Sequence, residues 1–435
     1  MNPSQTQPGT ETTSSTHTAT HGGRPRNVVV GVGGGIAAYK ACGLVRWFTK
    51  RGENVRVVPT ENALRFVGAA TFEALSGNPV NTGVFSHVDE VEHVRVGQQA
   101  DLVVIAPATA DLIARLAMGR ADDLLTATVL VATCPVVVAP AMHTEMWRNA
   151  ATQANVATLR ARGVVVLEPA HGRLTGPDSG PGRLPEPEQI AELAEAAYAG
   201  VGFGQALRGK RVVVTAGGTQ ENLDPVRFLG NRSSGKQGFA LAELASQRGA
   251  DVLLIAGHTD TLPTPNGVHL QRIRSARELQ SAVVDASREA DAVIMAAAVA
   301  DFRPASEAIT KLKKGHDDEA LHTLQLVENP DILAELVAAR GASTCPYIVG
   351  FAAETAQPDA EPLALAQRKL ERKGCDLLMC NDVSGGGVFG REENSGWLLR
   401  HPRSHEDVEP EVVPVGGKLE VAGRILDAVA AALSS

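Results

Sequence analysis

The chain has 435 residues, of which 44% are hydrophobic, 21% charged and 4% aromatic. This length exceeds one ordinary domain core and predicts two domains. The formal net charge of −8 disfavours a nucleic-acid partner, which normally requires a basic face. Five cysteines without CxxC spacing suggest neither a disulfide framework nor a zinc site, and they fit a reducing cytoplasm.

The sequence shows no signal for a membrane helix or a secretory leader. Residues 1–26 are rich in Thr, Ser, Gly and Pro without an apolar run, which predicts a disordered tail. The longest apolar run, residues 129–142, contains Pro135 and Pro140 and is shorter than the roughly 20 residues that a membrane helix needs. We therefore expect a buried strand there and no membrane partner.

Strands and helices alternate between residues 27 and 200, which predicts a doubly wound α/β domain with a parallel sheet. The expected strands are short β-branched runs at residues 28–32, 55–59, 101–106, 136–139 and 164–167. Helices are expected at residues 37–50, after the strand at 101–106, and at 185–199. The continuous apolar character of these strands predicts a sheet covered on both faces.

The alternation starts again at Lys210 and predicts a second doubly wound, Rossmann-like domain over residues 210–435. Strands are expected at residues 211–214, 252–255, 292–295, 347–350 and 377–379. Helices are expected at residues 238–248, 275–290, 331–339 and 362–373. Residues 200–209 contain four glycines, so we place the linker at residues 201–209.

The first glycine-rich segment, GVGGGI at residues 31–36, lies between a strand and a helix, where backbone N–H groups favour a phosphate. The dinucleotide fingerprint would place a glycine at Ile36 and an acidic residue near Pro59 and Thr60. A mononucleotide is therefore preferred to NAD. A simple tight turn is the alternative interpretation.

The second glycine-rich segment, GNRSSGKQ at residues 230–237, matches the spacing of a P-loop but not its chemistry. Gln237 stands where a P-loop has a magnesium-binding Ser or Thr. Fifteen residues also separate the segment from the strand expected at 211–214. Both observations argue against a P-loop ATPase.

Three segments of the first half carry further information: GGIAAYK at residues 34–40, APATAD at 106–111 and PAMHTEMW at 140–147. Together they resemble the flavin-dependent cysteine decarboxylase family. The resemblance covers residues 27–200 and implies a catalytic histidine at His93, with His87 as a nearby histidine without that role. It also implies substrate contacts from Met142 and His143. The implied FMN-binding residues are Gly33, Gly34, Gly35, Ile36, Thr60, Ala108 and Thr109.

The resemblance implies decarboxylation of a cysteine carboxylate. Loss of CO2 needs an electron sink, which oxidation of the thiol to a thioaldehyde creates while FMN accepts the hydride. Decarboxylation gives an enethiol, and return of the hydride gives a saturated product. His93 would assist removal of the thiol proton.

Three positions depart from the family pattern. His143 replaces an asparagine that helps to hold the substrate carboxylate, although a histidine still donates one hydrogen bond. The substrate flap at residues 176–183 lacks the cysteine that protonates the enethiol in many relatives, so the proton donor is unassigned. Gly33 replaces a serine that often contacts the flavin phosphate, which leaves a backbone contact.

The second half contains a series of motifs in a fixed order. They are TAGGT at residues 215–219, DPVRFLGN at 224–231, SSGK at 233–236, AAAVADFR at 296–303, KLKK at 311–314, NPDI at 329–332 and GFAAET at 350–355. Together these motifs resemble the phosphopantothenate–cysteine ligase family. The resemblance implies that 4'-phosphopantothenate attacks CTP to give an acyl-cytidylate and pyrophosphate, and that the cysteine amine then displaces CMP. Lys311 matches the lysine that forms the acyl-cytidylate, and Asn231 matches the asparagine that handles it.

The same resemblance implies a CTP site and Mg²⁺ bound with the triphosphate, without an assigned set of metal ligands. Lys311, Lys313 and Lys314 concentrate positive charge, although two of them can equally be solvated surface. Lys369 and Lys373 are four residues apart and share one helix face. The implied CTP-binding residues are Met295, Ala296, Ala297, Asp301, Lys311, Pro330, Asp331, Ile332, Leu333, Phe351, Lys369 and Lys373.

Together the two resemblances imply a bifunctional enzyme of coenzyme A biosynthesis, in which the ligase product is the decarboxylase substrate. One alternative is a non-catalytic flavin-binding regulatory protein of the same fold. Another is a decarboxylase of a peptide C-terminal cysteine, which would leave the CTP motifs unexplained. The resemblance further implies a homo-oligomer in which decarboxylase trimers are linked by ligase dimers into a dodecamer.

Overall fold

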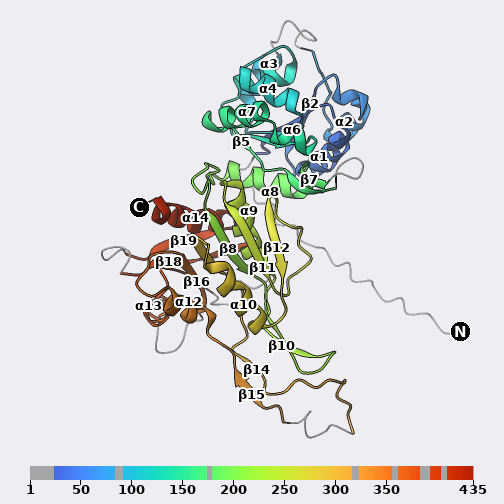
Figure 1. The fold of residues 1–435 in the computed structure, drawn as a ribbon. Helices are drawn as coiled ribbons and strands as arrows, with labels where there is room; N and C mark the ends of the chain where they lie inside the picture. Colours follow the sequence, from blue (N-terminus) through green and yellow to red (C-terminus); the bar gives the residue numbers. More distant parts are fainter. Residues whose placement is uncertain are drawn as a thin grey trace, which may run out of the picture.

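The computed structural model describes residues 24–83, 92–173, 179–315, 323–354, 361–382, 392–402 and 409–434. Figure 1 shows two lobes, one built from each half of the chain, with helix α8 (Pro187–Tyr198) between them. Most of the expected N-terminal tail lies outside the described residues. His87 and residues 176–178 of the expected flap lie outside them too.

A five-stranded parallel sheet of order β2-β1-β3-β4-β5 forms the centre of the first lobe. Side chains of β1 alternate between two cores, because Val28 and Val30 pack on one face of the sheet and Val29 on the other. The predicted parallel sheet, covered on both faces, is confirmed. Its strands are β1 (Asn27–Val32), β2 (Asn54–Pro59), β3 (Leu102–Ala108), β4 (Val136–Pro140) and β5 (Val165–Val166).

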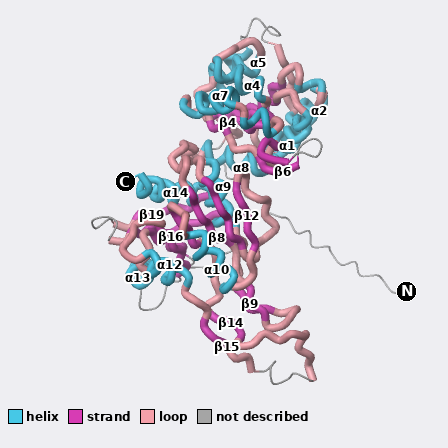
Figure 2. Tube along the Cα trace, in the orientation of Figure 1, coloured by secondary structure: helices cyan, strands magenta, loops and turns pink. Residues whose placement is uncertain are grey.

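Helices cover both faces of this sheet (Figure 2). One face packs against α1 (Ala41–Thr49), α2 (Ala69–Ser76) and α8. The other packs against α3 (Glu92–Gln99), α4 (Ala110–Met118), α5 (Leu124–Val131), α6 (Thr144–Arg148) and α7 (Ala150–Ala161). The 3-10 turns η1 (Ile36–Lys40) and η2 (Ala63–Arg65) and the hairpin of β6 (Ala170–Arg173) and β7 (Ser179–Arg183) complete the lobe.

The expectation of one buried strand over residues 129–142 is wrong for the first part of that run. Residues 129–131 form the last turn of α5, and the strand β4 begins at Val136. Pro135 lies between the two elements. This apolar run therefore contains the end of a helix and a separate strand. Apolar character alone does not distinguish a buried helix from a buried strand.

An eight-stranded sheet of order β12-β11-β8-β13-β16-β17-β18-β19 forms the centre of the second lobe. The first six strands are parallel: five of them were predicted, and β12 was not. Strands β18 and β19 are antiparallel additions at one edge. The strands are β8 (Arg211–Ala216), β11 (Asp251–Ala256), β12 (Val268–Arg272), β13 (Ala292–Met295), β16 (Tyr347–Glu354), β17 (Leu377–Asp382), β18 (Glu393–Arg400) and β19 (Glu411–Gly417).

Connection length explains why β18 and β19, which were not predicted, extend this parallel sheet in the antiparallel direction. Only residues 383–392 separate β17 from β18, and residues 401–410 separate β18 from β19. A parallel connection needs a crossover of a dozen or more residues, so these two strands return in the antiparallel direction.

Among the described residues, five helices and two small hairpins complete the second lobe. Helices α9 (Lys236–Gln247) and α14 (Lys418–Ser434) cover one face, and α10 (Ala276–Ser287), α12 (Ile332–Arg340) and α13 (Pro362–Lys373) cover the other. The hairpin of β9 (Gln220–Asn222) and β10 (Phe228–Gly230) follows β8. The hairpin of β14 (Phe302–Pro304) and β15 (Leu326–Glu328) follows β13. Figure 1 shows both hairpins at the end of the molecule farthest from the first lobe.

Direct contacts join the two lobes. Phe203 of the segment after α8 and Leu419 of α14 each pack against the cores of both lobes. The buried Gln247 side chain accepts a hydrogen bond from the Glu168 backbone N–H at 2.8 Å, and it donates one to Glu243 Oε1 at 2.9 Å. The junction is therefore a packed interface with a polar bridge across it.

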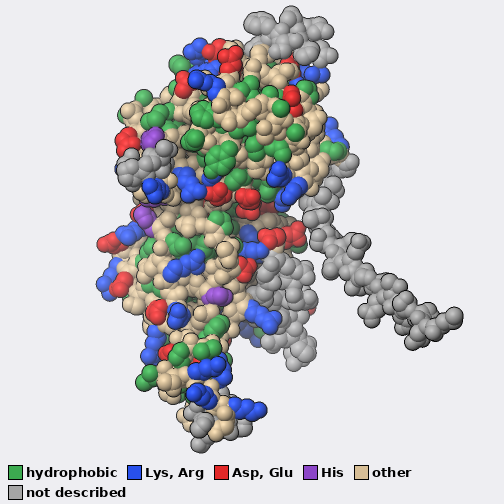
Figure 3. Space-filling model, turned by 90° about the vertical axis from the view of Figure 1, so that its right-hand side faces the viewer, with side chains coloured by type: hydrophobic (Ala, Val, Ile, Leu, Met, Phe, Trp, Pro, Cys, Tyr) green, Lys and Arg blue, Asp and Glu red, His purple; other side chains and the backbone are tan. Residues whose placement is uncertain are grey.

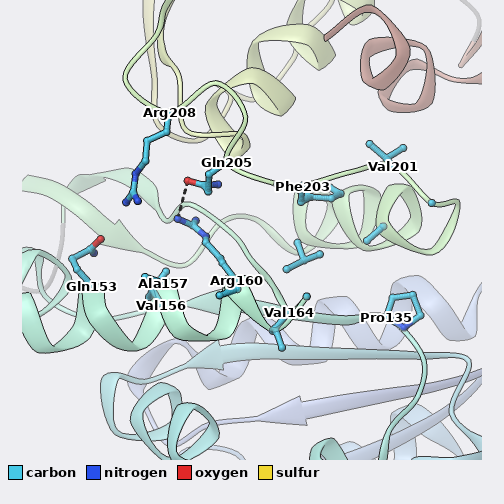
Figure 4. A pocket seen from close by; sticks show the side chains of 16 residues that line it. Pro135, Gln153, Val156, Ala157, Arg160, Val164, Val201, Phe203, Gln205 and Arg208 are labelled. Atoms are coloured by element: carbon cyan, nitrogen blue, oxygen red, sulfur yellow. Dashed lines mark hydrogen bonds between the residues drawn. The ribbon is translucent and has the colours of Figure 1, made fainter. Parts of the chain in front are cut away.

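A cavity of about 590 Å³ lies at this junction, between α7 and the segment that follows α8. Figure 4 shows Arg160 and Gln205 side by side in its wall, joined by a hydrogen bond of 3.3 Å, with Phe203 and Val164 close by. None of the site residues expected from the sequence lines this cavity. The cavity is therefore separate from both expected sites.

Replacing Gln247 with leucine should destabilise the protein by about 1–3 kcal/mol, because the change removes hydrogen bonds to buried groups at the junction. Urea unfolding followed by circular dichroism would measure the effect. Gln280, which bonds the side chain of Glu335 on the surface, provides the control, and Gln280→Leu should cost less than about 0.5 kcal/mol. Equal unfolding midpoints for the two variants would contradict the role of Gln247.

Candidate functional sites

The strand order of the first sheet identifies its ligand-binding edge. In an open parallel sheet, ligands bind beyond the carboxyl ends of the strands, where the strand order reverses. The order β2-β1-β3-β4-β5 places this reversal between β1 and β3, the same point at which flavodoxin-like sheets bind FMN. The loops that leave these two strands contain residues 33–36 and Thr109, which are residues expected at the FMN site.

Glycine is required in the first loop because neighbouring main chain approaches it closely. The Gly33 N–H donates to the Pro107 carbonyl at 2.9 Å, and a Cβ at Gly33 would lie 2.5 Å from that oxygen. A Cβ at Gly34 would lie 2.4 Å from Asn62 Cβ. Because the Gly33 N–H is already bonded to Pro107, it cannot make the expected contact to a phosphate. The N–H groups of the neighbouring loop residues 34–36 are the ones left for that contact. Gly35 has open space, since the nearest atom to a Cβ there is Thr109 Cγ2 at 3.8 Å.

The remaining residues of the expected FMN site line the same edge. Thr60 is buried directly after β2, and its Oγ1 accepts from the Ala63 N–H at 3.2 Å. Thr109 caps α4 by accepting from the Leu112 N–H at 3.2 Å. Ala108 ends β3, and the Ile36 side chain is 71% exposed beside the loop.

His93 lies in the first turn of α3, which precedes β3 and so begins near the carboxyl edge of the sheet. Its Nδ1 is buried without a hydrogen-bond partner among the described residues. The adjacent Glu92 is 2% exposed, pairs with Arg56 of β2 and accepts from Asn81 Nδ2 at 2.9 Å. This buried network fixes the turn that carries His93. The sequence did not reveal it, because its three members are scattered along the chain.

The hairpin β6–β7 covers the expected substrate segment. The Met142 N–H donates to the Gly182 carbonyl at 2.9 Å, and His143 is the N-cap of α6 with no side-chain capping bond. Thr144 Oγ1 is buried without a partner, and a Cβ at Gly180 would lie 2.4 Å from it. Thr144 was not among the site residues predicted from the sequence. The one sequence feature that could have identified it is its position directly after His143.

These features fit a bound flavin mononucleotide. The glycine loop meets Thr109 at the strand-order reversal, where a phosphate can approach backbone N–H groups. Two buried polar atoms, on His93 and Thr144, lack partners among the described residues. Buried polar atoms without partners are uncommon, which makes these two atoms candidates for contact with a ligand.

The second sheet has its own reversal. Its parallel strands follow the order of a Rossmann fold, so the reversal lies between β8 and β13. The loops after these strands are joined by backbone hydrogen bonds from Ala298 N to Gly217 O at 2.8 Å and from Thr219 N to Ala298 O at 3.2 Å. Thr215 Oγ1 accepts from the Ala297 N–H at 3.0 Å. Met295, Ala296 and Ala297 of the expected CTP site therefore lie at this reversal.

The residues expected to form and handle the acyl-cytidylate lie on segments that leave the same edge. Asn231 directly follows β10, and its Nδ2 donates to the Val299 carbonyl at 3.0 Å. Lys311 is exposed on the segment after β14. Asp301 is also exposed, and its carbonyl accepts from the Asn329 N–H at 2.8 Å.

The other expected CTP residues surround the start of α12. Asp331 caps this helix by accepting from the Ala334 N–H at 3.2 Å, and it forms an ion pair with Lys373 of α13. Burial opposes ionisation of Asp331, but hydrogen bonds from Lys373 and Ala334 outweigh it and hold the pKa of this carboxyl below its ordinary value. In this structure Lys373 is therefore held by Asp331.

The remaining members of this set lie close by in the fold. Pro330 precedes the helix cap, and Ile332 and Leu333 begin α12. Phe351 is on β16, half-buried against the core. Lys369 lies one turn before Lys373 on α13.

No group of three or more His, Cys, Asp or Glu side chains among the described residues could hold a metal ion. None of the helices within the described ranges is both long and apolar enough to cross a membrane.

Comparison with known proteins accounts for both lobes. Residues 16–198 match the family model described as Flavoprotein. Residues 207–433 match the DNA/pantothenate metabolism flavoprotein C-terminal domain. Among solved structures, the C-terminal domain of a coenzyme A biosynthesis bifunctional protein CoaBC is 33% identical and covers 53% of this chain and 99% of that chain, with a TM-score of 0.43.

Full-length relatives are more similar. The coenzyme A biosynthesis bifunctional protein CoaBC of Mycolicibacterium smegmatis is 58% identical over 414 residues, which is 94% of this chain and 98% of the relative. The protein of the same name from Mycobacterium tuberculosis is 57% identical over 409 residues, which is 93% of this chain and 96% of the relative. The chain therefore belongs to the family of bifunctional coenzyme A biosynthesis proteins.

Proposed function

We propose that the C-terminal half joins cysteine to 4'-phosphopantothenate with CTP, and that the flavoprotein half decarboxylates the product to 4'-phosphopantetheine. The observation that supports the proposal is that residues expected for each reaction, the loop at 33–36 with Thr109 and the segment at 295–297, lie at the strand-order reversal of their own sheet. Membership of the bifunctional family supports it. The proposed domains are residues 27–200 and 210–435, with residues 201–209 as the linker.

In the flavoprotein half, the loop at residues 33–36 and Thr109 hold the phosphate of FMN, with Thr60 and Ala108 beside it. Bound FMN supplies a two-electron acceptor for hydride from the substrate. His93 accepts the thiol proton, which prepares the cysteine sulfur for oxidation. Met142 and His143 hold the substrate carboxylate, and the hairpin β6–β7 above them limits access of water.

In the C-terminal half, the phosphopantothenate carboxylate attacks the α-phosphorus of CTP, and pyrophosphate leaves. Lys311 stabilises the negative charge that develops in this step. Asn231 holds the acyl-cytidylate while the cysteine amine attacks its carbonyl carbon and CMP leaves. Lys369 and the start of α12 contribute to binding of CTP.

His93→Asn should abolish CO2 release and leave CMP formation unchanged, because the two reactions use separate sheets. The purified protein would receive 4'-phosphopantothenate, cysteine, CTP and Mg²⁺, and CMP, CO2 and product mass would be measured. Absence of CMP with the wild-type protein would refute the ligase function. A non-catalytic flavin-binding protein would release neither CMP nor CO2.

We propose Mg²⁺ bound to the phosphates of CTP, because triphosphates in enzymes are normally bridged by this ion, which retains water ligands and needs few protein groups. The absence of a metal-ligand cluster among the described residues is compatible with such a site. Chelation with EDTA should stop CMP formation and leave CO2 release from supplied 4'-phosphopantothenoylcysteine intact. CMP formation that continues in EDTA would contradict the proposal.

We further propose that the protein is a cytoplasmic homo-oligomer, with trimers through the flavoprotein half and dimers through the C-terminal half. Exposed apolar side chains on the hairpins of the second lobe support the dimer, since Phe228 is 50% and Leu326 47% exposed. Figure 3 shows hydrophobic side chains among lysines and arginines at this end of the molecule. A second copy of the chain would cover them.

Replacing both Phe228 and Leu326 with serine should weaken the dimer without disturbing the trimer. Light scattering after size-exclusion chromatography would then give the mass of a trimer in place of a dodecamer. Val412 serves as a control, because it is also exposed but lies on β19 and not on either hairpin. Val412→Ser should leave the mass unchanged. An unchanged mass for the double variant would exclude the hairpins as the dimer contact.

A further inference from the structure

The turn between β9 and β10 contains a buried carboxylate that the proposed reactions do not use. Asp224 is 1% exposed. Its Oδ1 accepts the backbone N–H groups of Val226 and Arg227, both at 2.7 Å, which closes the turn. Its Oδ2 accepts the N–H of Leu312 at 3.2 Å, from a segment 88 residues farther along the chain. One carboxylate therefore joins two distant segments.

The ionised form of this carboxylate is the one that the turn favours. Burial alone would raise the pKa of Asp224, but the three backbone N–H groups and the nearby Arg227 charge outweigh burial and hold the pKa below its ordinary value. Arg227 Nη1 lies 3.6 Å from Asp224 Oδ2, and Arg227 Nη2 lies 3.4 Å from the Leu312 carbonyl, to which it donates. Both polar groups of the Leu312 backbone are thus held by the turn.

A second bond extends this anchoring to the other side of Lys311. The Ala308 N–H donates to the Leu223 carbonyl at 3.0 Å. The segment from Ala308 to Leu312 is therefore hydrogen-bonded to the β9–β10 turn at both of its ends. Lys311 lies inside this short segment, immediately before the residue that Asp224 holds.

The same turn continues directly to the other residue of the ligation site. Strand β10 ends at Gly230, and Asn231 follows it with its side chain bonded to the Val299 carbonyl. The hairpin β9–β10 is therefore a common support for Asn231 and for the segment that carries Lys311. A change in the turn would move the two residues relative to each other.

We propose that Asp224 is a positioning residue for ligation, whose carboxylate fixes the main chain beside Lys311 and so sets the place of Lys311 relative to Asn231. This inference rests on the proposed ligase function and adds to it a buried residue to which that proposal gives no substrate contact. The Lys311 side chain is long and exposed. Fixing the main chain from which it extends therefore limits the positions that its amine can reach.

Asp224→Asn is the most selective single substitution, because it keeps the size of the side chain and removes one of its two acceptor oxygens. The amide keeps one oxygen for the N–H groups of Val226 and Arg227, but its NH2 group cannot accept a hydrogen bond from the Leu312 N–H. Because a displacement of about 1 Å at a reacting group can cost about 100-fold in rate, kcat for CMP formation should fall about 10- to 100-fold. The KM for CTP should change much less, and CO2 release from supplied 4'-phosphopantothenoylcysteine should stay at the wild-type rate.

A double-mutant cycle with Lys311→Ala separates positioning from general support of the fold. If Asp224 acts through Lys311, Asp224→Asn should lower kcat by less than about twofold when Lys311 is already alanine. Asp291→Asn is the matched control, because Asp291 also accepts a backbone N–H, from Arg211 at 2.8 Å, but at the amino edge of the same sheet. This variant should form CMP at the wild-type rate.

Three results would overturn the proposal. Asp224→Asn could form CMP at the wild-type rate, or it could lower kcat by the same factor with and without Lys311, which would indicate a purely structural role. Lys311→Ala could form CMP at the wild-type rate, which would leave nothing for Asp224 to position. Failure of the ligase function itself is a separate outcome, because the wild-type protein would then form no CMP.

Discussion

Both candidate sites depend on one constraint of parallel sheets. Parallel strands all end at the same edge, so every loop that follows such a strand leaves there. Because crossover connections are right-handed, the two neighbouring loops turn to opposite faces where the strand order reverses, and they leave room between them. In the first sheet this room lies between β1 and β3, and in the second it lies between β8 and β13. Topology thus places the two candidate sites at equivalent points.

The two reversals are also stabilised in a similar way. The loops on either side of each gap are joined by backbone hydrogen bonds, from Gly33 to Pro107 in the first lobe and between Gly217 and Ala298 in the second. These bonds satisfy buried main-chain groups that would otherwise be costly. In the first lobe this bond brings the backbones close together, so a Cβ at Gly33 would lie 2.5 Å from the Pro107 oxygen. In the second lobe the close neighbour of Gly217 is a third loop, because a Cβ there would lie 2.3 Å from the His258 oxygen.

The sequence predicted the strands and helices that bury continuous apolar runs, including β1, β3, β8 and β13. It did not predict β12, β18 and β19, because the sequences VHLQR, ENSGWLLR and EVVPVGG mix polar and apolar residues and owe their strand form to pairing with a neighbour. The run at residues 129–142 was misjudged for a related reason, since apolar character does not distinguish a buried helix end from a strand.

The candidate sites were predictable where a motif is local and unpredictable where a contact is distant. The glycine loop and the segment after β13 are continuous in the sequence. The bond from Leu312 to Asp224, the pairing of Glu92 with Arg56 and the engagement of Lys373 by Asp331 join residues far apart in the chain. Single-sequence reasoning has no access to such pairs, because the fold brings them together.

The shared packing of Phe203 and Leu419 has a consequence for how this sequence can change over time. Each side chain is partly covered by apolar residues from both lobes, so its fit depends on two cores at once. A substitution in one half that alters this fit must be accommodated in the other. The two halves are therefore not freely exchangeable modules, and natural selection acts on them as a single unit even though their chemistry is separate.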